Sequence, residues 1–129
     1  MRPPTKEWIE KAEEDWRAAI RLGRGRKPLF NSVCFHAQQC VEKYLKAFLE
    51  ENNLPIHRTH DLGVLLKELP PQLAELVLIK DELEDLTSYS VSFRYPGEDA
   101  DLAQARAARK TAARVRELVR MKLRLPNHK

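Results

Sequence analysis

Two short stretches of the chain carry residues whose types and spacing could do chemistry. The segment CFHAQQCVEKYLKAFL, residues 34–49, places His36 and Lys43 among apolar residues. The segment SFRYPG, residues 92–97, contains Arg94 and Tyr95, and its proline disfavours a helical conformation for the residue before it. An arginine flanked by aromatic residues in a loop can bind a planar anion or a nucleobase. The alternative for Arg94 is a bond to the carbonyls of a helix end.

The C-terminal part of the chain is strongly basic. Residues 102–129 carry nine basic and one acidic residue, whereas residues 70–101 carry two and eight. Neighbouring like charges on a helix repel each other by a few tenths of a kcal/mol. Their partner is therefore either the acidic segment or a second copy of the protein, or a nucleic-acid or nucleotide phosphate. At about 100° per residue, seven cations fall within about 160° of arc on the last predicted helix: Arg106, Arg109, Lys110, Arg114, Arg116, Arg120 and Arg124.

Other polar residues have simpler interpretations. His57, His60 and Asp61 could suggest a metal site, but zinc normally needs a third or fourth ligand at a defined spacing. We predict no metal and no cofactor, and expect His60 to shape a turn. His36 could equally be a hydrogen-bonded boundary residue, and Lys43 a solubilising one. The segment GRGRK, residues 23–27, lacks the preceding strand and following Ser or Thr of a phosphate loop, so we expect a solvated connection that adds to an anion-binding surface.

The elements that must position these residues are helices, because apolar residues recur at helical spacing and strand patterns are nearly absent. We predict five helices: from Thr5 as N-cap to Gly23, from Asn31 or Ser32 to Glu51, from Asp61 to Leu69 after a Thr59 cap, from Pro70–Pro71 to Thr87, and from Asp99 or Asp101 to Leu123. The stretch SYSVSFRYPGED is expected to be irregular. The predicted fold is an all-α, up-and-down antiparallel bundle of four long helices plus one short helix.

Composition limits the remaining possibilities. The 129 residues are enough for one domain, residues 1–129, with a real core. No apolar run approaches the roughly 18–20 residues of a membrane span, and the N-terminus lacks a signal-peptide core, so we expect a cytoplasmic protein. Cys34 and Cys40 lie about 9 Å apart along one helix, beyond the reach of a disulfide, and are expected to be reduced and buried.

Four motifs in order give the chain a resemblance to a known family. The segments AEEDWRAA, CFHAQQCVEKYLKAFL, THDL and RYP together resemble the HEPN domain, named for its occurrence in higher eukaryotes and prokaryotes and its proposed nucleotide binding. The resemblance implies a helical bundle that pairs into homodimers and a frequent partnership with a minimal nucleotidyltransferase. It also implies that the polar residues of the central helix and His60–Asp61 face a shared cleft or a partner.

The same resemblance bears on catalysis. Many HEPN proteins are metal-independent RNases with a histidine four to six residues after an arginine, where the histidine would act as acid and base and the arginine would stabilise phosphorane charge. Here Arg94 is followed by YPGEDADLAQA, and no histidine appears before His128. The RNase pattern is therefore missing.

We predict a non-catalytic HEPN protein, a homodimer that binds a nucleotide or another anion as accessory to a nucleotidyltransferase, in the manner of a toxin–antitoxin pair. Its expected cleft residues are Arg94, Tyr95, His36, Lys43 and His60. One alternative is an RNase toxin with a site rebuilt across the dimer from Arg94 and His36, and the other is a pure interaction module. RNA is a further possible partner, and no membrane association is expected.

Overall fold

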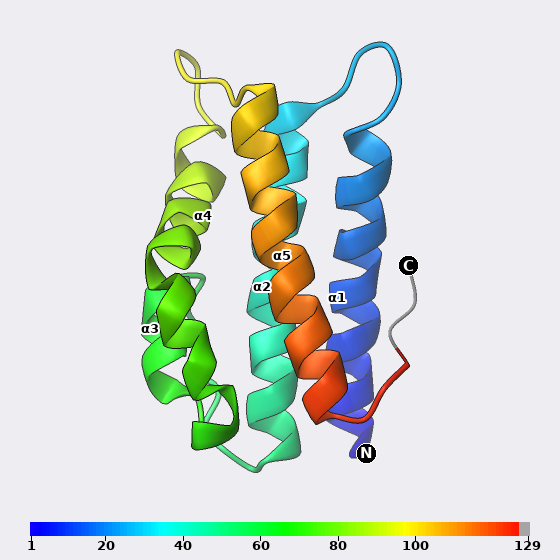
Figure 1. Ribbon diagram of the computed structural model, residues 1–129, viewed down its shortest axis with the longest axis vertical. Helices are drawn as coiled ribbons and strands as arrows, with labels where there is room; N and C mark the ends of the chain where they lie inside the picture. Colours follow the sequence, from blue (N-terminus) through cyan, green and yellow to red (C-terminus); the bar gives the residue numbers. More distant parts are fainter. Residues whose placement is uncertain (127–129) are drawn as a thin grey trace.

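The computed structural model describes residues 1–126, and in this part of the chain all regular structure is helical. The long elements are α1 (Pro3–Leu22), α2 (Phe30–Glu51), α4 (Lys80–Ser92) preceded by the 3-10 helix η1 (Pro71–Ile79), and α5 (Leu102–Lys122). The short helix α3 (Leu62–Glu68) lies beside η1 and α4. Successive long elements run antiparallel, with α5 in front of α2 and between α1 and α4 in Figure 1. The predicted bundle of four long elements and one short helix is confirmed.

The centre of the bundle is α2, which packs against α1, α3, α4 and α5. Its sequence already carried an apolar arc about twice as wide as a surface helix needs. Val33, Cys34, Tyr44, Leu45 and Leu49 are fully buried, and both cysteines are free. None of the described helices is long and apolar enough to cross a membrane.

The start of α1 differs from the prediction. The helix begins at Pro3, and a proline in the first helical turn costs nothing because its missing N–H would have no partner there. Thr5 is therefore not the N-cap but a buried residue within the helix, and its hydroxyl donates to Glu51 Oε1 at 2.9 Å. The predicted cap was wrong because Glu51, from the end of α2, offers a better partner than the helix's own backbone.

The restart before α3 also differs in detail. Asp61, not Thr59, caps the helix: its carboxylate accepts from the N–H groups of Gly63 at 2.8 Å and Val64 at 3.3 Å. Thr59 acts one step earlier, because its hydroxyl oxygen accepts from the Asp61 N–H at 3.1 Å. The two side chains together fix the turn from which α3 starts.

The fourth long element was predicted to end at Thr87, and this was wrong. Its first part is 3-10, with Leu73, Leu76 and Ile79 buried at a spacing of three residues. The α-helical part continues through Ser92, because Tyr89 and Phe93, about one and two turns beyond Leu86, keep packing on the core. Pro96 and Gly97, which has a φ of 99°, lie in the turn that follows.

The start of α5 is defined by Asp101, one of the two predicted positions. Its carboxylate accepts from the Gln104 N–H at 2.8 Å, and the Gln104 side-chain oxygen accepts from the Asp101 N–H at 2.9 Å. This reciprocal pair is a capping box, which satisfies two N–H groups at the helix start. The buried side of α5 includes Ala105, Ala108, Ala112, Val115 and Val119.

Candidate functional site

The polar residues of α2 lie on the side of the helix away from α5. Tyr44, which reaches α5 through Arg120, lies half a turn of helix away from Phe35, since nine residues at about 100° each make two and a half turns. We call the residues on the Phe35 side the α2 seam: His36, Gln38, Gln39, Glu42, Lys43 and Lys46. One flank of this seam meets α1 and the other meets the connection that leads to α3.

Asp15 of α1 organises the first flank. Its buried carboxylate lies with Oδ1 2.8 Å from His36 Nδ1 and with Oδ2 2.6 Å from Lys43 Nζ. Because a carboxylate only accepts, His36 must carry its proton on Nδ1 in this bond. The Nε2 atom of His36 has no hydrogen-bond partner among residues 1–126. Asp15 was not among the predicted site residues, although its place between the apolar Ala12 and Trp16 of α1 marked it as facing the interior.

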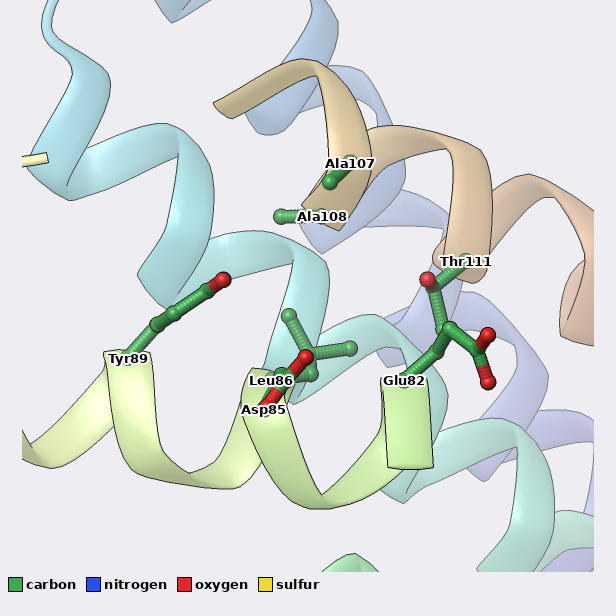
Figure 2. Close-up of a pocket in the computed structure, with 7 residues that line it drawn as sticks. All are labelled: Glu82, Asp85, Leu86, Tyr89, Ala107, Ala108 and Thr111. Carbon is green, nitrogen blue, oxygen red and sulfur yellow. The ribbon is translucent and has the colours of Figure 1, made fainter. Parts of the chain in front are cut away.

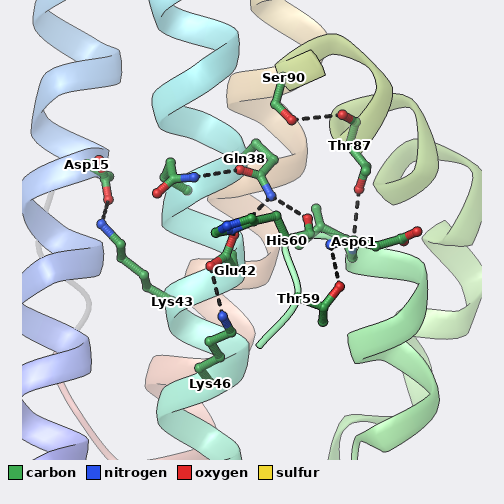
Figure 3. A network of polar contacts seen from close by, with 12 residues as sticks. Asp15, Gln38, Glu42, Lys43, Lys46, Thr59, His60, Asp61, Thr87 and Ser90 are labelled. Atoms are coloured by element: carbon green, nitrogen blue, oxygen red, sulfur yellow. Dashed lines mark hydrogen bonds and ion pairs between the residues drawn. The ribbon is translucent and has the colours of Figure 1, made fainter. Parts of the chain in front are cut away.

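Glu42 organises the second flank, which Figure 3 shows. Its buried carboxylate accepts from Lys46 Nζ at 3.0 Å and lies 2.8 Å from His60 Nδ1. Gln38 joins the same group by donating to the His60 carbonyl at 2.8 Å and to Glu42 at 3.3 Å. His60 therefore fixes the turn before α3, while 81% of its side chain stays exposed.

Arg94 reaches the α2 seam through an aromatic side chain. Its guanidinium carbon lies 5.3 Å from the centre of the Phe35 ring, and the Phe35 ring meets the His36 ring edge-on at 5.3 Å. The structure thus places Arg94, Phe35 and His36 in one contact chain, with Lys43 connected through Asp15. Sequence reasoning missed Phe35, whose signal was an apolar side chain on the polar side of α2.

A shallow cavity of about 180 Å³ adjoins Arg94 between α2 and α4. Three aromatic rings, two hydroxyls and an amide border it together with the guanidinium: Phe35, Tyr89, Phe93, Ser32, Ser90, Asn31 and Arg94. Tyr95 does not line this cavity, and its side chain is 65% exposed. Of the five predicted cleft residues, Arg94, His36 and Lys43 lie together, His60 lies on the opposite flank of the seam, and Tyr95 points elsewhere.

The predicted basic face of α5 is divided by the fold. Arg116 and Arg120 are only 4% and 6% exposed and face α1, so their assignment to the surface was wrong. Arg116 donates to both Glu13 oxygens, Nε to Oε2 at 2.7 Å and Nη2 to Oε1 at 2.8 Å, and stacks on Trp16. The Tyr44 hydroxyl donates to Glu13 and accepts from Arg120 Nη1 at 3.1 Å. Arg124 follows α5 in a left-handed conformation, with a φ of 59°.

The charges in this buried cluster stabilise each other. Burial alone would raise the pKa of Glu13, but hydrogen bonds from Arg116 and Tyr44 and the charges of Arg116 and Arg120 hold it below its usual value. The hydrogen bond to Glu13 likewise raises the pKa of Arg116. Glu13 and Arg116 are thus ionised together at neutral pH, in a closed group that joins α1, α2 and α5.

Other candidate sites have little capacity for chemistry. The cavity between α4 and α5 in Figure 2 has about 30 Å³, room for little more than a water molecule. Burial raises the pKa of Cys34 to about 11 and that of Cys40 further, so neither thiol is ionised at neutral pH. His57 pairs with Glu68 at 3.5 Å and turns away from His60. His128 lies outside the described residues.

The acidic segment 70–101 packs beside the basic face of α5, where Glu82 lines one cavity with Lys110 and Arg114, but does not form ion pairs with it in the described residues. Within residues 1–126, no ion pair joins a carboxylate of that segment to an α5 arginine or lysine. The α5 cations that do form ion pairs, Arg116 and Arg120, use Glu13 of α1. Of the alternatives open for the basic face, direct ion pairing with this segment within one chain is therefore not observed among the described residues.

Comparison with known proteins agrees with this geometry. The family described as HEPN domain matches residues 5–122. The protein TT1696 from Thermus thermophilus has a similar fold, with a TM-score of 0.77, 23% identity, and coverage of 92% of this chain and 97% of that one. ST0689, an archaeal HEPN homologue, also has a similar fold, with a TM-score of 0.72 and 24% identity. The match covers 92% of this chain and 97% of that one. No curated protein matches the chain. With nearly its whole length matched by the family, this chain belongs to the HEPN domain family.

Proposed function

We propose that the protein is an accessory HEPN protein that binds a nucleotide at the α2 seam, with Arg94 on phosphate. The observation that carries the proposal is the contact chain from Arg94 over Phe35 to His36, which continues through Asp15 to Lys43. Three groups able to bind an anion thus follow one edge of α2. The adjoining cavity supplies aromatic rings on which a base can stack.

The electrostatics of the seam suit a reversible ligand. Asp15 and Glu42 are buried carboxylates that hold the side chains of His36, Lys43, Lys46 and His60 in place. The ammonium groups of Lys43 and Lys46 keep further N–H donors beyond the bond to their carboxylate, and each histidine can donate from Nε2 when that atom carries a proton. A phosphate can therefore bind without displacing the ion pairs, and the site is positioned before the ligand arrives.

Calorimetric titration with ATP and GTP tests this site. In the Arg94→Gln variant we expect affinity to fall at least about tenfold, because a charge-assisted contact contributes about 1.5–3 kcal/mol. The matched control is Arg58→Gln, which removes an exposed arginine outside the seam and should leave affinity unchanged. Equal losses in both variants, or no binding by the wild type, would refute the proposal and favour a pure interaction module.

The proposal includes two protein partners: a second copy, with the α2 seams facing a shared cleft, and a minimal nucleotidyltransferase. A native mass spectrum of the protein gently purified from its own cells tests both. We expect the mass of a homodimer, carrying either a second chain of nucleotidyltransferase size or a bound nucleotide. A monomer would count against the shared cleft, and a bare homodimer would remove the support for the nucleotidyltransferase.

One observation favours a second candidate function, metal-independent RNA cleavage. Asp15 fixes the proton of His36 on Nδ1 and leaves Nε2 to accept a proton, which is what a general base requires. Arg94 lies beyond Phe35, where it could stabilise charge on a phosphorane. This candidate expects cleavage of an end-labelled RNA in the presence of chelator, abolished by His36→Gln and by Arg94→Gln. An RNA with a 2′-deoxy sugar at the cleavage site should resist. Intact RNA after prolonged incubation with the wild type would eliminate this function.

A further inference from the structure

Two stretches of the chain contain basic residues but no acidic ones. Residues 16–41 carry no Asp or Glu, and residues 102–116 carry none either. The first stretch includes the end of α1 and its connection to α2, and the second is most of α5. Figure 1 shows the connection at the same end of the bundle as the first turns of α5.

The fold brings the two stretches into contact at Gly23. A methyl group added to this glycine would lie 3.6 Å from Arg109 Nη1, so α5 reaches over the end of α1. The cations on either side are exposed, apart from the half-buried Arg109. We call this group the basic end: Arg21, Arg24, Arg26, Lys27, Arg106, Arg109 and Lys110.

The basic end differs from Arg116 and Arg120 of α5, which pair with Glu13, in forming no ion pair. Within the described part of the chain, none of its seven side chains forms an ion pair with a carboxylate. The nearby Asp99 accepts from Asn31, and Asp101 is engaged in capping α5. The mutual repulsion of the seven cations is thus relieved by no ion pair within the described residues, although Glu82 lines a cavity beside Lys110.

We infer that the basic end binds the phosphate backbone of a nucleic acid without regard to sequence. Cations spread over two elements suit an extended polyanion, and each phosphate contact releases condensed counterions. The residues between them include Gly23, Gly25 and the exposed Ala107, and none of them is aromatic, so the surface lacks the rings that stack on bases. The α5 part of this surface is separate from the α2 seam, because α5 lies on the opposite side of α2.

Fluorescence anisotropy with labelled oligouridylate and oligothymidylate of about 20 nucleotides tests the inference, between about 50 and 200 mM salt. The expected slope of log affinity against log salt concentration is about −0.7 per phosphate contact, or about −5 if all seven cations take part. Both probes should give similar slopes, because the contacts are to phosphate. Binding of the RNA probe alone would contradict backbone recognition.

Two variants separate the halves of the surface. The loop variant, Arg24→Gln/Arg26→Gln/Lys27→Gln, should make the salt slope less steep by about 2. The α5 variant, Arg106→Gln/Lys110→Gln, should make it less steep by about 1.4. The control Lys6→Gln/Lys11→Gln/Lys67→Gln makes the same charge change as the triple variant at exposed positions elsewhere. It should leave the slope unchanged.

Four results with these variants would overturn the inference. The wild type could fail to bind either probe, or the control could flatten the slope as much as the loop variant does. The loop variant could also change only the sedimentation velocity of the protein and not the slope, which would identify the partner as an acidic protein surface. An effect of the α5 variant without any effect of the loop variant would likewise refute a joint surface.

Discussion

Glu13 and Asp15 lie two residues apart on α1, and each carboxylate organises a cluster of basic side chains. The Glu13 cluster is closed, whereas the Asp15 cluster is open to solvent. At about 100° per residue they point to opposite flanks of the helix, Glu13 toward α5 and Asp15 toward the α2 seam. Glu13 is enclosed by Arg116, Tyr44 and Arg120. Asp15 instead holds His36 and Lys43, which remain 29% and 22% exposed.

The difference separates a structural ion pair from a possible binding site. In the Glu13 cluster the carboxylate oxygens are used by buried partners, so a ligand finds no free group. In the Asp15 cluster the carboxylate is buried, but its two partners, His36 and Lys43, keep unused positions toward solvent. A buried carboxylate that positions partly exposed basic side chains therefore indicates a binding site better than the number of charged residues on a helix does.

The largest expected effect is loss of stability on breaking the closed cluster. Glu13→Gln leaves the guanidinium of Arg116 buried without its counter-charge, and we expect the free energy of unfolding to fall by about 3 kcal/mol. Urea unfolding measures it. The control Glu14→Gln changes the exposed neighbouring carboxylate and should cost little. A loss below about 1 kcal/mol for Glu13→Gln would show that the cluster contributes little to holding α1, α2 and α5 together.

The next largest effect is the pH dependence of this loss in unfolding free energy. Because the pKa of Glu13 is held below its ordinary value of 4.5, its stabilising contribution is fully present above pH 4.5 and disappears as pH falls through the lowered pKa. The difference in unfolding free energy between the wild type and Glu13→Gln should therefore be constant near neutrality and narrow below pH 4.5. Urea titrations at several pH values measure it, and a gap that widens in acid would contradict this sign.

A smaller loss is expected for Tyr44→Phe. The change removes one hydroxyl that donates to Glu13 and accepts from Arg120, while Arg116 and Glu13 stay paired. We expect about 1–1.5 kcal/mol in urea unfolding, the usual contribution of a buried hydrogen bond. In the Glu13→Gln background the same change should cost less, because the two residues share one network. Full additivity would mean that the hydroxyl acts independently of Glu13.

The smallest effect on stability is expected at the open cluster. Asp15→Asn keeps an oxygen that accepts from one partner, so unfolding should change by no more than about 1 kcal/mol. Affinity for ATP should nevertheless fall at least about fivefold, because His36 and Lys43 lose the charge that holds them in position. Asp81→Asn, on the exposed start of α4, is the matched control. A large loss of unfolding free energy together with unchanged affinity for ATP would instead show that Asp15 has a structural role.

Local patterns predicted the elements of the fold better than their ends. Apolar spacing located every helix, because burial repeats with the helical period. The start of α1 and the end of α4 depended on distant partners instead. The Thr5 hydroxyl donates to Glu51 and does not cap α1, and packing on the core extends α4 past Thr87 to Ser92. A cap or an end is decided by small differences between competing hydrogen bonds, which nearby sequence does not reveal.

The candidate site was predictable in part. His36, Lys43 and Arg94 were identified by residue type and by resemblance to the HEPN domain, and the structure brings them to one edge of α2. Phe35 and Asp15 join them but were not foreseen. Each makes its contact with a residue from a different element, so its role depends on how those elements pack.

The sequence alone determined the all-helical bundle, the central place of α2 and the family, since all three follow from periodicity and motif order along the chain. Only the tertiary structure decided which cations are ion-paired and which are free. Arg109 and Arg116 belong to the same basic stripe of α5, but Arg116 lies opposite Glu13 and Arg109 lies over Gly23. The physical reason is that ion pairing depends on distances of a few ångströms between helices, and those distances are set by the packing of the whole core.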